Sequence, residues 1–419
     1  MKVGAFLVWS LIVFAGLLAV PAVSHTNAQT TFSLMASSMA FVGMAIAQFM
    51  AARPPVIEPL FGGLDRIYHL HRRIGISVLM LILVHYFLTP DFKGLSFTSG
   101  LNQLAASAGK YGFYGLTALL VLSIVKIIPK TRIEIPYHLW RYTHRFIGLL
   151  FALVAFHQMF IKRPYDSTAL LAVYLNAFAA LGILSYAYTQ LLPWLRTRCY
   201  EVSEVEKHDG ATIISARSKG RALRAKPGQF GFLRVLKAGL REPHPFTIAD
   251  IDGNGTVRFA IKPLGDYTQA LRDQIAVGDR LKLEGGYGQF NHRRGAKKQI
   301  WLAGGIGVTP FLAMASHLKG DEDQDIHMVY CVRDRKEAIG LETFEAQAEK
   351  LGNFSFVLHD SATDGRLDAA KLAAGSVIDP GEADLWFCGP APLREAIVKG
   401  LKELGKKPRR VEFEQFQFR

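Results

Sequence analysis

The feature that most constrains this sequence is the uneven distribution of its apolar residues. Hydrophobic residues make up 50% of the chain, but residues 1–194 contain long runs with almost no charge, whereas residues 195–419 are rich in Lys, Arg, Asp and Glu. A run of about 20 apolar residues is long enough to cross a bilayer as a helix. The sequence therefore predicts a membrane-embedded half followed by a soluble half, with the join near Pro193 and Arg196.

Six stretches in the first half are long enough to span the membrane, and we expect them at 4–23, 32–51, 69–90, 110–129, 144–161 and 168–193. Most of the basic residues between them fall on one side: Arg53, Arg66, Arg72, Arg73, Lys126, Lys130, Arg132, Arg141, Arg145, Arg196 and Arg198. Only Lys93, Lys110, Lys162 and Arg163 fall on the other. The richer side is cytoplasmic by the positive-inside rule, so the soluble half is expected in the cytoplasm.

The first apolar stretch has an alternative interpretation as a cleaved signal peptide, because Lys2 precedes the run and small residues follow it. Its length favours a membrane span. The net charge of +14 does not indicate nucleic-acid binding, since many of the basic residues flank the membrane stretches. The three cysteines, Cys199, Cys331 and Cys388, are far apart, which disfavours a disulfide framework or a cysteine-ligated metal.

Four histidines lie in two of the membrane stretches at matched spacing. His71 and His85 are fourteen residues apart in one stretch, and His144 and His157 are thirteen apart in another. At 1.5 Å per residue these pairs are separated by roughly 20 Å along their helices. Ionisable residues inside a membrane usually have a function, and haem iron is commonly held by axial histidines. The four residues therefore predict two bis-histidine haems, one near each face of the membrane.

Other interpretations of these histidines remain open. A single histidine near a helix end is commonly an interfacial side chain, and His69 and His138 are competitors of this kind near the cytoplasmic end. Thirteen residues also leave a rotation of about 140° on a straight helix. The helix with His144 and His157 must therefore kink, or meet its haems on different flanks. Phe151 lies about midway between them and is a candidate either for ordinary packing or for a bridging position.

The soluble half divides into two patterns. Residues 195–296 contain short strands with frequent turns, such as "TIISARS" and "RLKLEGGYG", which predict an antiparallel β-barrel. Residues 297–419 alternate apolar strands with helical stretches, which predicts a doubly wound α/β sheet. Gly304, Gly305 and Gly307 follow the first of these strands and precede a helix. Glycines at that place let the backbone approach a pyrophosphate at the helix N-terminus.

Five motifs together resemble one family. "HPFT" (244–247), "KPLGDYT" (262–268), "GGYG" (285–288), "AGGIGVTPF" (303–311) and "FCGP" (387–390) are similar to the ferredoxin-reductase-type domains of the NADPH oxidase and ferric reductase superfamily. The spacing of the membrane histidines is similar too, and the likeness is greatest to compact bacterial NADPH oxidases. The resemblance implies a transmembrane haem domain at 1–194, an FAD-binding barrel at 195–296 and a NAD(P)-binding domain at 297–419, in a bacterial inner membrane.

The resemblance also implies roles for individual residues. Those expected to hold FAD are His244, Pro245, Phe246, Thr247, Lys262, Gly265 and Thr268, with Phe416 covering the flavin ring. Those expected to hold the nicotinamide nucleotide are Gly304, Gly305, Ile306, Gly307, Thr309, Pro310, Cys388, Gly389 and Pro390. Thr247, Cys388 and Phe416 are the ones placed at the reacting rings. Phe416 has a simpler alternative, since Phe413 and Phe418 flank it and all three suit a packed terminal strand.

The predicted function follows from this order of cofactors. Hydride passes from the nicotinamide to FAD, and single electrons then pass through the inner haem (His71, His144) and the outer haem (His85, His157) to an external acceptor. We expect oxygen as acceptor, giving superoxide, with ferric chelate as the alternative. Arg333 and Arg335 follow an apolar strand, where a guanidinium suits the 2′-phosphate of NADPH, so NADPH is expected over NADH. Ordinary surface charge is the alternative interpretation of these two residues. No obligatory protein partner is evident.

Two other classes of protein use some of these features. A transporter could use membrane histidines as a proton relay, but it needs no flavin–nicotinamide module. A quinone-linked haem anchor with a separate reductase would lack the C-terminal domains. Haem and flavin absorbance together would distinguish the proposed enzyme from both.

Overall fold

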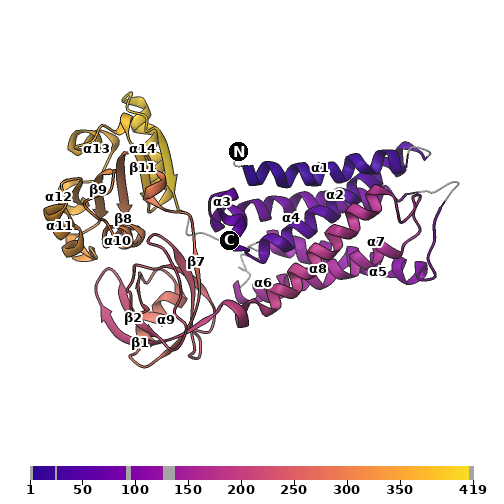
Figure 1. The fold of residues 1–419 in the computed structure, drawn as a ribbon, viewed down its shortest axis with the longest axis horizontal. Coiled ribbons are helices and arrows are strands. Elements are labelled where there is room, and N and C mark those ends of the chain that lie inside the picture. The colour runs from indigo at the N-terminus through magenta and orange to yellow at the C-terminus, as the bar shows by residue number, and fades with distance from the viewer. Residues whose placement is uncertain (1–2, 24–25, 91–95, 126–136, 415–419) are drawn as a thin grey trace, which may run out of the picture. The chain divides into compact units, whose positions relative to one another are not determined.

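The structure is a computed structural model that describes residues 3–23, 26–90, 96–125 and 137–414. The chain forms two compact units, Met1–Leu195 and Arg196–Arg419 (Figure 1). The first is helical. The second contains two β-sheets with helices.

The described helices of the first unit follow the predicted apolar stretches. They are α1 (Val3–Ala22), α2 (Ala28–Ala51), the 3-10 turn η1 (Pro55–Ile57), α3 (Glu58–Phe61), α4 (Leu64–Phe87), α5 (Asn102–Ile124), α6 (Tyr137–His144), α7 (Phe146–Phe160) and α8 (Leu170–Arg196). Among the described residues, four helices are long and apolar enough to cross a membrane: α1, α2, α4 and α8. The helical membrane domain is thereby confirmed.

The two remaining predicted spans differ in detail from the expectation. The stretch predicted at 110–129 is represented by α5, which begins earlier, at Asn102, and ends at Ile124. The stretch predicted at 144–161 is divided, because the helix is interrupted at Arg145 between α6 and α7. This interruption directly follows His144, at a place where a kink is one of the two alternatives that the thirteen-residue spacing leaves open.

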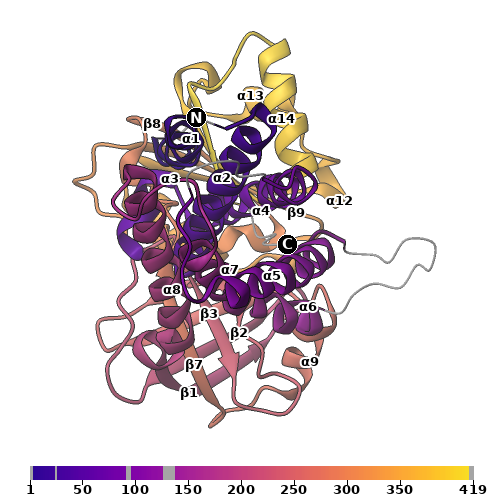
Figure 2. The same ribbon diagram turned by 90° about the vertical axis from the view of Figure 1, so that its right-hand side faces the viewer.

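The most extensive helix contacts join α2 to α4, α5 to α7 and α1 to α2, and Figure 2 views these helices nearly end on. Small residues allow close approach within the pairs. A Cβ added at Gly43 of α2 would lie 2.9 Å from Val78 on α4, and one at Gly112 of α5 would lie 2.8 Å from Val154 on α7. Such glycines at helix contacts are typical of membrane bundles, where association depends on close packing.

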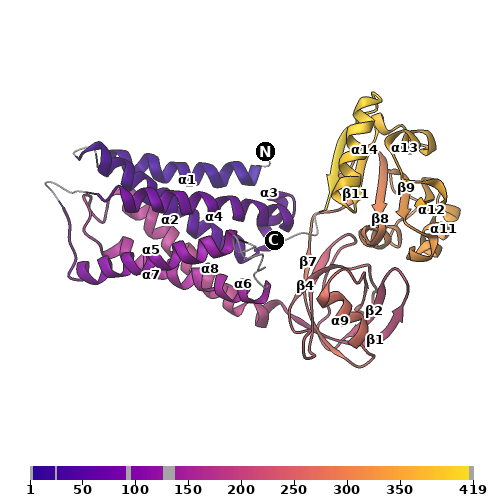
Figure 3. The ribbon, with the colours of Figure 1, turned by 180° about the vertical axis from the view of Figure 1, so that it is seen from behind.

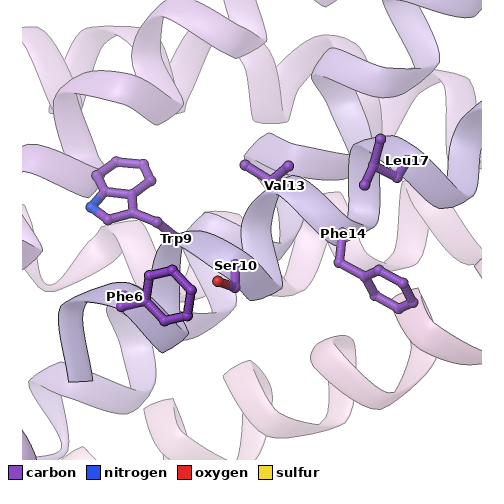
Figure 4. Close-up of a pocket in the computed structure, with 6 residues that line it drawn as sticks. All are labelled: Phe6, Trp9, Ser10, Val13, Phe14 and Leu17. Carbon is purple, nitrogen blue, oxygen red and sulfur yellow. The ribbon is translucent and has the colours of Figure 1, made fainter. Parts of the chain in front are cut away.

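One face of α1 is apolar and exposed. Phe6, Trp9, Ser10, Val13, Phe14 and Leu17 line a shallow groove along it (Figure 4). The opposite face packs inward through small residues such as Gly4 and Gly16, which approach Phe61 and Met39. An outer face of this composition suits contact with lipid chains.

The second unit begins with a seven-stranded antiparallel sheet. Its strands are β1 (Arg198–Lys207), β2 (Thr212–Ser218), β3 (Phe230–Val235), β4 (His244–Thr247), β5 (Asp250–Ile251), β6 (Thr256–Ile261) and β7 (Arg280–Tyr287), with helix α9 (Asp266–Gln274) before β7. The order is β4-β3-β7-β1-β2-β6-β5. Strands β4 and β5 form the two opposite edges of this sheet, but only Ile248 and Ala249 separate them in the sequence. The chain therefore passes directly from one edge of the sheet to the other. The predicted antiparallel barrel is confirmed.

The second sheet has five parallel strands in the order β10-β9-β8-β11-β12. Its elements are η2 (His292–Arg294), β8 (Lys298–Gly304), η3 (Gly305–Val308), α10 (Thr309–Ala315), β9 (Asp325–Val332), η4 (Arg335–Glu337), α11 (Leu341–Lys350), β10 (Phe354–Asp360), α12 (Ser361–Asp364), α13 (Ala369–Gly375), η5 (Pro380–Glu382), β11 (Asp384–Cys388), α14 (Ala391–Glu403) and β12 (Arg410–Phe413). Figure 3 shows this sheet from behind.

Helices cover both faces of the parallel sheet, as the continuous apolar strand β8 requires. Trp301 and Ala303 of β8 face the core formed with α10 and α11, which contribute Phe311 and Phe344. Ile300 and Leu302 face the opposite core, formed with α13 and α14. The predicted doubly wound α/β domain is confirmed, and the carboxyl ends of its neighbouring strands β8 and β11 lie side by side.

Candidate functional site

The structure brings the four membrane histidines together in two pairs. His71 and His85 lie on α4, His144 ends α6, and His157 lies on α7. The rings of His71 and His144 have centroids 6.0 Å apart. That separation leaves room for one metal atom with two metal–nitrogen bonds of about 2 Å. The rings of His85 and His157 are close enough for a charge on one to affect the other.

Each of the four rings is held through Nδ1 by a neighbouring helix. Nδ1 of His71 lies 3.2 Å from the carbonyl oxygen of Ala47, and Nδ1 of His157 lies 2.8 Å from that of Ala105. The other two rings contact serine hydroxyls, at 2.9 Å between His85 Nδ1 and Ser33 Oγ, and at 2.8 Å between His144 Nδ1 and Ser123 Oγ. His85 Nδ1 also lies 3.2 Å from the Ser33 carbonyl oxygen.

This pattern suits metal ligation. A metal-binding histidine commonly donates its second ring N–H to a carbonyl or another polar group, which fixes the tautomer and the ring orientation. With Nδ1 engaged, Nε2 of all four histidines has no hydrogen-bond partner among the described residues. The residues present therefore fit two haems, each between one ligand on α4 and one on α6 or α7.

Two glycines border these rings. Gly75 follows His71 by one helical turn, and a Cβ added to it would meet no atom within 4 Å, so open space lies on that face of α4. Gly109 of α5 has the opposite environment, because a Cβ there would lie 2.5 Å from Cε1 of His157. The open space beside His71 suits a flat macrocycle between two helices, and the close contact of Gly109 limits where the His157 ring can lie.

The remaining membrane residues singled out in the sequence have distinct positions. Phe151 is fully buried and stacks on Phe41 of α2, with ring centroids 5.2 Å apart. It also lies against Gly182 of α8, where an added Cβ would lie 2.7 Å from Cζ of Phe151 and closer still to Cε1. His69 is exposed. The side chain of His138 lies outside the described residues.

The predicted flavin site is built on the edge strand β4. Thr247 is 5% exposed, and its Oγ1 has no hydrogen-bond partner among the described residues. It pairs with Phe230, which in turn pairs with Tyr287 on β7. His244 stacks on Tyr267, with centroids 3.7 Å apart. A buried hydroxyl without a partner, beside an aromatic wall, fits the polar edge of a flavin ring.

The aromatic side of the predicted flavin site, at Tyr287, lies near Arg196, the first residue of the second unit. The guanidinium of Arg196, the last residue of α8, lies 5.5 Å from the centroid of the Tyr287 ring. Only Thr197 separates α8 from β1. The predicted flavin site is therefore close, within the second unit, to the point where the chain leaves the membrane helix.

The predicted phosphate-binding residues of the barrel have local roles in the structure. The backbone N–H groups of Leu264 and Gly265 donate to Thr268 Oγ1, at 2.9 and 3.0 Å, so Thr268 caps α9. Lys262 forms an ion pair with Glu337 of η4, at 2.8 Å. The Lys262 side chain thus joins the barrel to the α/β domain.

The glycine-rich turn and the "FCGP" segment meet at the carboxyl ends of β8 and β11. A Cβ at Gly304 would lie 2.8 Å from Cδ of Pro390, and one at Gly389 would lie 2.9 Å from the nitrogen of Gly304. A Cβ at Gly307 would lie closer still to the carbonyl group of Cys388. Gly305 has φ of +55° and faces open space, which leaves its backbone accessible to a ligand.

The other nucleotide-site residues follow from this arrangement. Thr309 is buried and donates to the carbonyl of Ile306 at 3.1 Å. Arg333 directly follows β9 and is exposed, whereas Arg335 lies 3.5 Å from Glu345. Burial, and then the nearby Glu414 carboxylate, raise the pKa of the Cys388 thiol well above its usual range. A raised pKa favours the neutral thiol over the reactive thiolate at Cys388.

Several contributors were not identified from the sequence. Ser33 and Ser123 are ordinary small residues in apolar helices, and nothing in their spacing marks them as histidine partners. Glu414 is 8% exposed and lies close to Cys388 and Gly288. The signal in the sequence that could have identified Glu414 was an acidic residue next to the aromatic tail. Phe416 itself lies outside the described residues.

Comparison with known proteins assigns each part to a class. Residues 36–155 match the model of the ferric reductase like transmembrane component, residues 199–298 that of an FAD-binding domain, and residues 301–399 that of an oxidoreductase NAD-binding domain. Two curated relatives are the electron transfer components of 2-halobenzoate 1,2-dioxygenase from Burkholderia cepacia and toluate 1,2-dioxygenase from Pseudomonas putida. They are 29% and 30% identical over 52% and 51% of this chain, and each match spans 66% of the relative's length.

One solved structure is similar over nearly the whole chain. The flavohemoglobin from Malassezia yamatoensis with bound FAD and heme matches with a TM-score of 0.50 at 17% identity, covering 96% of this chain and 99% of that one. At this identity the likeness concerns the fold alone.

The fold and the three matches define a membrane-bound, FAD- and NAD(P)H-dependent electron-transfer oxidoreductase. The succession of a ferric-reductase-like transmembrane domain, an FAD-binding domain and a NAD-binding domain gives this chain the architecture of the NADPH oxidase and ferric reductase type.

Proposed function

We propose that the protein is a transmembrane NADPH oxidase of a bacterial inner membrane. It would carry electrons from cytoplasmic NADPH, by way of FAD and two b-type haems, to oxygen on the outer side. The observation that carries the proposal is the uniform Nδ1 bonding of His71, His85, His144 and His157. In all four histidines this bonding leaves Nε2 as the ring nitrogen that can bind iron.

The haems, when bound, supply one-electron chemistry, and the chain's own residues set their positions. The inner pair would be His71 and His144, and the outer pair His85 and His157. Phe151 and Phe41 form a stacked pair at intermediate depth, since Phe151 is seven residues from His144 and six from His157. Their role would be to keep the two haem sites separate and dry.

In the soluble unit, the residues would position the reacting rings rather than react themselves. Thr247 offers a buried hydroxyl to the flavin edge, and the open backbone at Gly305 receives the nucleotide phosphates. Cys388, buried and uncharged, would pack beside the nicotinamide with Gly389 and Pro390. Phe416 would cover the flavin ring until the nucleotide displaces it.

Oxygen is favoured as acceptor because the outer segments offer little to bind iron. The stretch 91–109 has one acidic residue and neither His nor Cys. Lys162 and Arg163 follow His157 and supply positive charge, which stabilises a developing anion. The backbone of Arg163 is fixed by a bridge to Phe97. Ferric chelate is the second candidate, because an open haem edge would reduce it as well.

The test uses purified full-length protein with NADPH and FAD. A haem Soret band together with flavin absorbance is expected first. Reduction of cytochrome c that superoxide dismutase suppresses, with matching oxygen consumption, is then expected from an oxidase. If dismutase has no effect and oxygen is not consumed while ferric chelates are reduced, the ferric reductase alternative replaces the oxidase. Absence of haem would overturn both.

A further inference from the structure

The charged residues of the segment 210–241 are all positive. The segment contains eight basic residues and no acidic one: Arg217, Lys219, Arg221, Arg224, Lys226, Arg234, Lys237 and Arg241. Five of the eight fall within residues 217–226, at the end of β2 and in the connection to β3. We call this segment the basic loop. All five of its basic side chains are exposed.

Few of these charges are neutralised within the protein. Lys219 pairs with Glu201 at 3.0 Å. The other four basic side chains of the loop form no ion pair with any residue that the structure describes. The basic loop thus presents a patch of positive charge that calls for an external counterpart, unlike the mixed surface of the α/β domain with its several ion pairs.

The loop is fixed close to the end of the last membrane helix. The backbone N–H of Lys219 donates to the carbonyl of Cys199 at 2.9 Å, and that of Leu223 donates to the Tyr200 hydroxyl at 2.8 Å. Leu223 is buried, which turns its neighbours Arg221 and Arg224 outward. Cys199 comes three residues after Arg196, where α8 ends, and three residues span at most about 10 Å.

From this placement we propose that the basic loop binds the anionic phospholipid headgroups of the leaflet at which α8 ends. Clustered Lys and Arg next to a membrane helix are attracted to anionic headgroups within a Debye length of the surface, about 8 Å at physiological salt. Nucleic acid is a poorer match, because residues 217–226 contain no aromatic side chain on which a base could stack. The proposal rests on the membrane topology and does not depend on the acceptor.

The test compares hydrogen exchange in full-length protein reconstituted into two kinds of nanodisc. One contains only zwitterionic phosphatidylcholine, and the other also contains phosphatidylglycerol. Amides of residues 217–226 should exchange at least about fivefold more slowly in the anionic discs, since each basic residue near such a surface strengthens binding by about that factor. Raised salt should remove the difference, because it screens exposed charges.

A variant with Arg217, Arg221, Arg224 and Lys226 changed to Gln should show no difference between the discs. The matched control changes four exposed basic residues of the α/β domain to Gln: Lys350, Arg366, Lys402 and Lys407. It should retain the full protection of the loop. Two results would overturn the proposal. One is equal exchange of the native loop in both kinds of disc, and the other is a Gln variant whose loop is protected in anionic discs as strongly as the native loop. Protection by an added oligonucleotide in zwitterionic discs, with none from phosphatidylglycerol, would assign the loop to nucleic acid instead.

Discussion

Replacement of Gly109 by Ala should selectively remove the outer haem. Gly109 of α5 lies directly behind the His157 ring, and the added Cβ would be 2.5 Å from Cε1. Nδ1 of the ring would be closer still, and ordinary contact begins at 3.4 Å, so the ring must retreat by at least about 0.9 Å. That movement exceeds the roughly 0.5 Å within which a ligand constellation has to be held. It also disturbs the 2.8 Å contact between His157 Nδ1 and the Ala105 carbonyl oxygen.

The expected result is a protein with about half the native haem content, since the inner pair His71 and His144 does not contact Gly109. The packing strain itself should cost about 1–3 kcal/mol of stability. A control for this strain is Gly112→Ala on the same helix, whose Cβ would lie 2.8 Å from a methyl group of Val154 rather than from a ligand. It should keep both haems.

The assay is haem quantification by the pyridine haemochrome spectrum, followed by optical redox titration of both variants in the same detergent. Native protein should titrate in two one-electron steps, and the Gly109→Ala variant in one. Two unchanged steps in the Gly109→Ala variant would refute the placement of His157 as an iron ligand. Equal loss in both variants would show that the effect is general helix strain.

The remaining predictions concern individual sites. His144→Leu should remove the inner haem and prevent NADPH from reducing the outer one, and full haem content would contradict it. Ser123→Ala should shift the inner haem potential by about 40 mV, the equivalent of one hydrogen bond of about 1 kcal/mol, as measured by redox titration. Arg333→Ala should raise KM for NADPH but not NADH, whereas Arg335→Ala, whose side chain already pairs internally, should not. Truncation after Glu414 should alter the rate of hydride transfer in stopped-flow experiments with haem content intact.

Much of the fold is predictable because length and apolarity act over many residues at once. The membrane half, the barrel and the α/β domain each have their own periodicity, and all three are present as expected. Boundaries were less accurate where the composition is ambiguous. The predicted span at 110–129 began too late, because "NQLAASAGKYG" (102–112) is too polar and too rich in small residues to suggest a span, yet forms the first turns of α5.

The four histidines were identifiable because the cost of polar groups in a membrane makes each one conspicuous. Spacing along a helix also gave their depths. It could not give their partners, because the Nδ1 contacts join residues 21 to 52 positions apart on helices whose rotation no local pattern reveals. The interruption at Arg145 was predictable as one of two alternatives, since it follows from the mismatch between thirteen residues and the helical repeat.

The arrangement of these partners has a consequence for how the two haem sites are built. In each proposed pair, one histidine contacts a backbone carbonyl and the other contacts a serine hydroxyl. A carbonyl only accepts, so it fixes its histidine with the proton on Nδ1 and leaves Nε2 as the basic atom. The serine hydroxyls act as acceptors too, because Ser123 Oγ donates to the Leu119 carbonyl at 2.6 Å and Ser33 Oγ donates to the His85 carbonyl at 3.3 Å. All four histidines would thus be held in the same tautomer, with the proton on Nδ1. Ser33 and Ser123 are the side chains through which the potentials of the two haems can be changed independently.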